Sequence, residues 1–220
     1  MDVTIVIPQH ERSELTLATV SALRRNESRD WPILVVDDGS SADAAAKLEQ
    51  LPDGVEVLRQ PHRGVTAAWN LGLQHVTTPI VVLLNNDVLI DGAWVERLSD
   101  PVRSGRAAVS GVERRRERAV PADVLQHLGR SEFAAGWCWS FRTADARAIG
   151  GFDPTLWLYF SDTDLQARLL RNADVAIVSD LPLRHLGHQS TRSLAGRGTQ
   201  WHADRARFIS KRRSDRLWAG

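Results

Sequence analysis

Short apolar runs, rich in β-branched residues, alternate with helical patterns over the first 92 residues, and this alternation constrains the fold more than any other feature. Four runs have the length and composition of strands: Val3–Ile7, Ile33–Val36, Val55–Leu58 and Ile80–Leu84, of which the last suits a strand buried on both faces. Helical patterns lie between them, at Ser13–Arg25, Ala42–Leu51 and Gly64–Val76. Because parallel neighbours need a crossover connection, this order predicts an α/β fold with a mostly parallel, doubly wound (Rossmann-like) sheet.

The fourth run, Ile80–Leu84, breaks abruptly into three polar residues, Asn85, Asn86 and Asp87. An open parallel sheet binds ligands in the crevice beyond the carboxyl ends of its strands. A carboxylate flanked by amides at that point suggests a hard cation with oxygen ligands. An ordinary Asx turn explains the same residues, because Asn and Asp are also common turn formers. Taken alone, the stretch leaves both interpretations open.

Beyond Gly92 the alternation weakens, and the C-terminal part of the sheet is expected to be mixed. Helical patterns cover Ala93–Ser104, Thr143–Ile149, Ser161–Asn172 and the basic segment Trp201–Trp218. Extended patterns cover Ala107–Val112, Phe133–Phe141, Val175–Val178 and Leu181–Leu186. The charge cluster Glu113–Arg118 is interpreted as a solvated loop or flap, and Ser190–Gly198 as a Gly-, Ser- and Arg-rich loop.

Composition narrows the class of protein further. A chain of 220 residues is long enough for one sizeable core, so a single domain is expected, and a net charge of +1 gives no reason to assume a polyanionic partner. The single Cys138 excludes an intramolecular disulfide. No apolar run approaches the roughly 18 residues of a membrane span, and the chain enters a strand pattern at once, so the expected location is cytoplasmic.

Seven segments, in this order, carry a resemblance to a known family: IVIPQHER from Ile5, VVDDGS from Val35, GVTAAWNLGL from Gly64, LLNNDV from Leu83, GGFDP from Gly150, YFSDTDLQARL from Tyr159 and HLGHQS from His185. The chain resembles the family 2 glycosyltransferases, inverting GT-A enzymes that use nucleotide-diphospho-sugars. The resemblance implies one GT-A type domain. Residues 1–92 would form the nucleotide-sugar half, 93–200 the acceptor half, and 201–220 a basic C-terminal helix.

The resemblance also implies how the donor is held. The residues that it assigns to the nucleotide-sugar are Pro8, Arg12, Asp37, Asp38, Asn70 and Asn86. A carboxylate that accepts from a pyrimidine N–H would select the base. The alternative for Asp37 and Asp38 is a turn and helix cap with Gly39 and Ser40. Trp69 stands where relatives often carry Arg, and Arg63 or the loop of Arg192 and Arg197 could replace that phosphate contact.

A metal site would complete the donor half. Asn85-Asn86-Asp87 would be the family's DxD-like motif with an amide in place of its first Asp, so Asp87 would bind Mn²⁺ or Mg²⁺. His185 matches the His that completes the metal or diphosphate site in many relatives, and His188 is its alternate. A lone His is more often structural than a ligand, which leaves the role of His185 open and favours His188 less.

Asp162 is the candidate general base, because it occupies the second position of the family's Glu-Asp-x-Asp motif. Ser161 replaces the usual Glu, which leaves the acceptor's orientation in doubt. A helix cap is the alternative for Asp162, and Asp164 could either position the acceptor or support the helix start. The remaining candidates for acceptor binding are Gly136, Trp137 and Trp157, although aromatic residues among apolar ones more often belong to a core.

The expected donor is a UDP, dTDP or GDP sugar, and the expected acceptor is a hydroxyl of a glycan, a lipid-linked molecule, a protein or another compound. A homodimer, and contact of the basic C-terminus with a membrane or nucleic acid, are further expectations beside the plainer one of a solvated helix face. Two alternatives stay open. A nucleotidyltransferase would need a Gly-rich phosphate loop that PQHERSE does not provide, and a catalytically silent binding module would suit Ser161, Trp69 and Asn85.

Overall fold

A computed structural model describes residues 1–111, 119–128, 133–169, 174–187 and 196–214. The whole charge cluster Glu113–Arg118, the alternate ligand His188 and the loop residue Arg192 lie outside these ranges. Among the described residues, no helix combines the length and apolar character that a membrane crossing requires.

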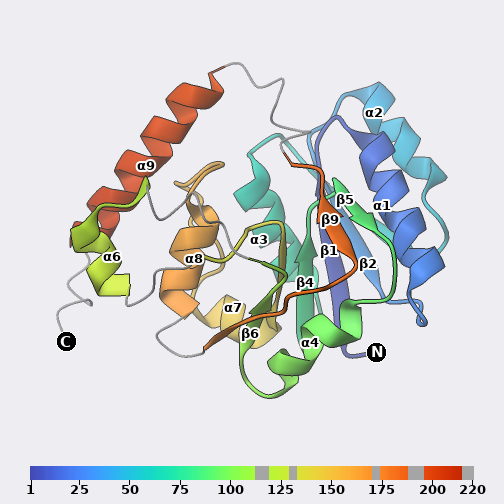
Figure 1. Ribbon diagram of the computed structural model, residues 1–220. Helices are drawn as coiled ribbons and strands as arrows, with labels where there is room; N and C mark the ends of the chain where they lie inside the picture. Colours follow the sequence, from blue (N-terminus) through green and yellow to red (C-terminus); the bar gives the residue numbers. More distant parts are fainter. Residues whose placement is uncertain (112–118, 129–132, 170–173, 188–195, 215–220) are drawn as a thin grey trace.

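A seven-stranded sheet forms the centre of the molecule, in the order β3-β2-β1-β4-β7-β6-β8 (Figure 1). Its strands are β1 (Val3–Gln9), β2 (Ile33–Asp38), β3 (Val55–Gln60), β4 (Ile80–Leu84), β6 (Ala107–Val109), β7 (Cys138–Arg142) and β8 (Val175–Ile177). The first four strands are parallel to one another, whereas β7 is antiparallel to both β4 and β6. The predicted α/β fold, with a parallel first half and a mixed C-terminal part, is therefore confirmed.

Each strand sends alternate side chains into two separate cores, as the two-residue period of a strand requires. On one face, Val3, Ile5 and Ile7 of β1 pack with α1 (Ser13–Asn26) and α4 (Val95–Arg103). On the other face, Val6 packs with α3 (Val65–His75), α7 (Thr143–Ala148) and α8 (Ser161–Leu169). Helices thus cover both faces, which is why β1, β2 and β4 read as nearly continuous apolar runs.

Several predicted boundaries are wrong by a few residues, and the end of β3 at Gln60 instead of Leu58 is one of them. β1 continues through Pro8 and Gln9, because Pro8 still pairs with Val36 of the neighbouring strand and one missing N–H does not end a central strand. β2 likewise includes Asp37 and Asp38, which pair with β3. The second helix is shorter than predicted: α2 (Ala42–Lys47) passes into the 3₁₀ turn η1 (Leu48–Gln50) before Pro52.

The C-terminal elements form a third apolar cluster beside the sheet. Helix α9 (Arg197–Ser214) lies next to α6 (Ala122–Leu128), and α8 lies between α9 and the sheet (Figure 1). Phe160 and Phe208 are fully buried in this cluster, with Leu156 and Val124 around them. A second, two-stranded sheet joins β5 (Val88–Ile90) to β9 (Leu183–His185), so it carries the chain after Asp87 to the side of His185.

Candidate active site

One cavity opens beyond the carboxyl ends of β1, β2 and β4, and both halves of the chain line it. The predicted site residues that line it are Pro8, Asp38, Asn86, Asp87, Gly136, Trp137, Trp157, Asp162 and His185. Four others, Arg12, Asp37, Asn70 and Asp164, are not among its lining residues. The parallel order of the strands explains the first group, because it brings residues far apart in the chain to one edge of the sheet.

Asp87 and His185 meet at the floor of this cavity. Residue Val88 of β5 pairs with His185 of β9, and this pairing brings His185 Nε2 to 2.9 Å from Asp87 Oδ1. The Nδ2 of Asn85 lies 3.3 Å from the same imidazole nitrogen, and Trp137 stacks on the ring at a centroid distance of 5.3 Å. Asp87 is only 5% exposed, so its carboxylate is held in a largely desolvated position.

Asn86 lines the cavity but is only 5% exposed, and its side-chain N–H groups bond to neighbouring residues of the protein. Its Nδ2 donates to Thr16 Oγ1 at 3.0 Å and to Gln9 Oε1 at 3.3 Å, and its carbonyl oxygen accepts from Thr19 Oγ1. These bonds tie the loop after β4 to helix α1. The contacts therefore make Asn86 an anchor for the neighbouring Asp87.

The Asp pair after β2 divides into two roles. Asp38 lines the cavity, and its carboxylate accepts from the backbone N–H of Arg63 at 2.9 Å and of Gly64 at 2.8 Å, and from Gln60 Nε2. It thereby fastens the loop between β3 and α3 to β2. Asp37 instead accepts from the backbone N–H and the hydroxyl of Ser40, which is the turn arrangement weighed as the alternative.

Two histidines beside Asp38 were not found from the sequence. The rings of His10 and His62 stack at a centroid distance of 4.0 Å, and His62 Nδ1 lies 2.9 Å from Asp38 Oδ2. The three residues each offer one ligand atom within 4.8 Å of the others, so this group could hold a metal ion. Each His stands alone in its own loop, and only the pairing of β1 with β2 and of β2 with β3 brings the two loops together.

Asp162 approaches the cavity from the opposite half of the molecule. It lies in the first turn of α8, and its Oδ1 accepts from the backbone N–H of Thr163 at 2.8 Å. Gly136 faces this carboxylate, and Trp157 lies over Gly64 at the cavity wall. The base candidate, the Asp87–His185 pair and the loop held by Asp38 thus surround one space.

The residues outside the lining have other contacts. Arg12 is paired with Glu14, and Asn70 both donates to the carbonyl oxygen of Phe152 and accepts from its N–H. Asp164 is fully buried, with Arg168 Nε 2.8 Å from its Oδ2. For Asp164, these contacts favour support of the helix start over contact with an acceptor.

A family model described as glycosyl transferase family 2 matches residues 4–166, well over half of the chain. The chain belongs to glycosyl transferase family 2. The resemblance found in the sequence motifs is therefore confirmed. The matched residues extend from β1 into α8 and include Asp38, Asp87 and Asp162 of the cavity, but they end before β8, β9 and α9 and therefore do not include His185.

Curated relatives of this family 2 chain are distant. A pre-mycofactocin glycosyltransferase of Mycobacterium tuberculosis is 27% identical over 195 residues, which cover 77% of this chain and 39% of the relative. An undecaprenyl-phosphate 4-deoxy-4-formamido-L-arabinose transferase of Sodalis glossinidius is 33% identical over 124 residues, which cover 52% of this chain and 38% of the relative. The chain therefore spans less than two fifths of the length of these relatives.

Solved structures show the same fold. The mannosyltransferase PcManGT from Pyrobaculum calidifontis, in complex with GDP-Man and Mn²⁺, aligns with a TM-score of 0.60 at 18% identity, and 82% of this chain and 55% of that one are covered. GalNAc-T7 with UDP, GalNAc and Mn²⁺ aligns with a TM-score of 0.66 at 14% identity, with 84% and 44% covered. At these identities the likeness establishes the GT-A fold alone.

Proposed function

We propose that this chain transfers a sugar, with inversion, from a nucleoside-diphosphate sugar to an acceptor hydroxyl, and that Asp162 is the general base. The observation that carries the proposal is that Asp162 and Asp87 line one cavity from opposite halves of the fold. Inversion needs a base on the face of the sugar opposite the leaving diphosphate. A carboxylate on each side of one space supports that arrangement, and family membership supports the choice of reaction.

The donor would lie along the edge formed by the first half of the chain. Pro8, Asp38 and Gly64 line the cavity there, and Asp38 holds the loop that would receive the base and ribose. The structural neighbours were solved in complex with GDP-Man and with UDP, which supports a nucleoside-diphosphate donor of the same class. The wall formed by Trp137 and Trp157 would receive the acceptor, because indole rings offer flat apolar surfaces to a sugar.

The residues at Asp87 suit a divalent cation. The desolvated carboxylate of Asp87 supplies the oxygen ligand that Mn²⁺ and Mg²⁺ prefer, and the imidazole nitrogen of His185 lies 2.9 Å from it. A bound ion would neutralise charge on the departing diphosphate. The His10, Asp38 and His62 group is a second place with suitable donors, and two nitrogen ligands there favour a softer transition metal.

The proposal is tested by turnover. Purified protein is incubated with UDP, dTDP and GDP sugars, with Mn²⁺, with Mg²⁺ or with EDTA, and release of the nucleoside diphosphate is measured. We expect release from one nucleotide class, lost with EDTA and lost with Asp162→Asn. Tight binding of a nucleotide-sugar without any release, by wild-type protein and across the panel, would favour the silent binding module instead.

A further inference from the structure

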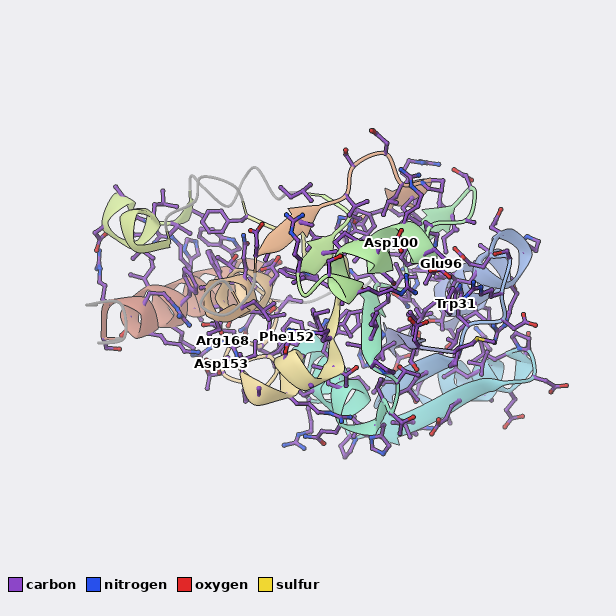
Figure 2. All side chains as sticks on the ribbon, turned by 90° about the horizontal axis from the view of Figure 1, so that it is seen from below. Trp31, Glu96, Asp100, Phe152, Asp153 and Arg168 are labelled. Carbon is purple, nitrogen blue, oxygen red and sulfur yellow. The ribbon has the colours of Figure 1, made fainter. Side chains whose placement is uncertain are left out.

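Helix α9 lies beyond the segment that matches the family. It nevertheless contacts the residues that form the acceptor side of the cavity. Residues 153–164, here called the acceptor segment, run from the turn after α7 into the first turn of α8 and carry Trp157 and Asp162. One face of α9 contacts this segment at its beginning, middle and end. Figure 2 shows Asp153 and Arg168 on the side of the molecule where α8 and α9 lie.

Asp204 of α9 holds the middle of the segment through the backbone. Its Oδ2 accepts from the N–H of Leu158 at 3.1 Å and of Tyr159 at 2.9 Å. The carboxylate is fully buried, and its Oδ1 accepts from Gln200 Nε2 at 2.8 Å. A buried carboxylate that accepts from two successive amides fixes the backbone directly, because leaving those donors unbonded would carry their full desolvation cost.

Phe160, which follows the two residues held by Asp204, has a strained backbone. Phe160 has a φ of +62°, a left-handed conformation that a bulky side chain rarely adopts. Its ring is fully buried and stacks on Phe208 of α9 at a centroid distance of 5.4 Å. Strain of this kind persists only where surrounding contacts impose it. It turns the chain into α8 two residues before Asp162.

The end of the segment is held by charge. Arg212 of α9 is almost fully buried and pairs with Asp164, and Lys211 Nζ lies 3.0 Å from the same carboxylate. Lys211 also pairs with Asp153 at the beginning of the segment. The buried Arg212 therefore ties α9 to the helical turn that carries Asp162. Lys211 joins that turn to Asp153 at the beginning of the segment.

We propose that α9 is a brace for the acceptor segment, in which Asp204 and Arg212 are positioning residues that set the place of Asp162 and Trp157. The proposal rests on the function proposed above for those two residues. It also gives the basic C-terminal helix a role within the molecule. Within the described part of α9, Arg205, Lys211, Arg212 and Arg213 all have partners in this chain, so these four cations are engaged internally.

A first experiment, which needs no substrate, measures whether α9 stabilises the backbone of the acceptor segment. In Asp204→Ala, amide hydrogen exchange at Leu158 and Tyr159 should accelerate by at least about tenfold, because their acceptor is removed. Asp204→Asn, which keeps one side-chain oxygen, should fall between that variant and wild type. Unchanged exchange in residues 153–164, or equal acceleration throughout the central sheet, would overturn the brace.

A second experiment reads its effect on the reaction, with the nucleotide-sugar that the wild type turns over best. Arg212→Met should lower kcat by about 10- to 100-fold and leave the donor KM within about twofold, because it displaces the base and not the donor loop. Arg212→Lys keeps the charge and should recover part of the rate. Arg213→Met is the matched control: it removes the next cation, whose partner Asp123 is exposed, and should behave as wild type.

The two experiments separate the two proposals. If wild-type protein turns over no donor, the proposed function fails, and the exchange measurement still decides whether α9 holds the segment. If Arg212→Met retains the wild-type kcat, or if Arg213→Met loses as much as it does, Arg212 has no positioning role. If Arg212→Met does not fold, Arg212→Lys and Lys211→Met, whose side chain is 37% exposed, apply the same test.

Discussion

Gly136 and Asp162 are packed so closely that any side chain at position 136 would require one of the two residues to move. A β-carbon added to Gly136 would lie 2.8 Å from Asp162 Oδ2, from the other side of the cavity. A gap this small is not reached by real side chains, so one of the two groups would have to move. The position of the candidate base is therefore set by the absence of a side chain opposite it.

Gly136→Ala should consequently displace the Asp162 carboxylate. We expect kcat to fall by about 10- to 100-fold, because a displacement on the order of 1 Å is enough to misalign a catalytic group. The affinity for nucleoside diphosphate, measured by calorimetry, should stay at the wild-type value. Gly111→Ala is the control, since nothing lies within 4 Å of a β-carbon there. Equal rates in both variants would show that Asp162 tolerates the shift or takes no part.

The place of the metal is decided by two single variants. Asp87→Ala should abolish the Mn²⁺-dependent part of nucleotide binding, because its carboxylate is the only one beside His185 and Asn85 in the described site. His62→Ala should leave that part unchanged. Calorimetry of UDP binding with and without Mn²⁺ measures both. The reverse pattern would assign the ion to the group of His10, Asp38 and His62.

The two carboxylates after β2 should respond differently to removal. Asp38→Ala releases the N–H groups of Arg63 and Gly64 and should raise the donor KM strongly. Asp37→Ala loses the turn with Ser40 and should instead lower the free energy of unfolding by about 1–3 kcal/mol, with little change in KM. Chemical unfolding and steady-state kinetics separate these outcomes. A raised donor KM in Asp37→Ala would return Asp37 to the nucleotide site.

Local pattern was enough to predict the elements that position the donor edge. Ile80–Leu84 is the strand β4 with the predicted bounds, and the parallel order alone brings Asp38 and Asp87 to one cavity. A short apolar run followed by polar residues is a strong signal of a strand end, because a strand buried on both faces needs apolar side chains at every position. Residues whose role depends on such a strand end were therefore predictable.

Contacts between distant segments were not predictable in the same way. The stacking of His10 on His62 depends on two loops that only the β1–β2–β3 pairings bring together. Asp164 has the same sequence signal as Asp162, but its charge is taken up by Arg212 of a helix far along the chain. Sequence periodicity shows which face of α9 is polar and does not show what that face contacts.

Asp153 links the brace to pH. Burial acts to raise the pKa of Asp153, but hydrogen bonds from Lys211 and from Thr155 outweigh it and hold the pKa below the ordinary value of 3.8. A carboxyl with a depressed folded-state pKa contributes stability above its unfolded-state pKa and loses it as the pH falls through the folded-state value. Asp153→Asn should therefore destabilise the protein more at about pH 6 than at about pH 3, where protonation of the carboxyl begins to remove the charged interaction. Chemical unfolding at the two pH values measures this, and an equal cost at both would exclude the charged interaction.

The mechanism depends on Asp162, and one substitution separates its two interpretations. General-base assistance is typically worth about 100- to 10,000-fold, so Asp162→Asn should lower kcat by a factor in that range and leave donor binding unchanged. A capping role would give another result, because Asn caps a helix nearly as well as Asp and the variant would lose little rate or stability. Asp162 Oδ1 accepts from the adjacent Thr163 N–H, and the side-chain oxygen of Asn can accept the same bond. Single-turnover measurements with the preferred donor report the rate of the chemical step separately from product release. Retention of more than about a tenth of the wild-type rate would exclude Asp162 as the base.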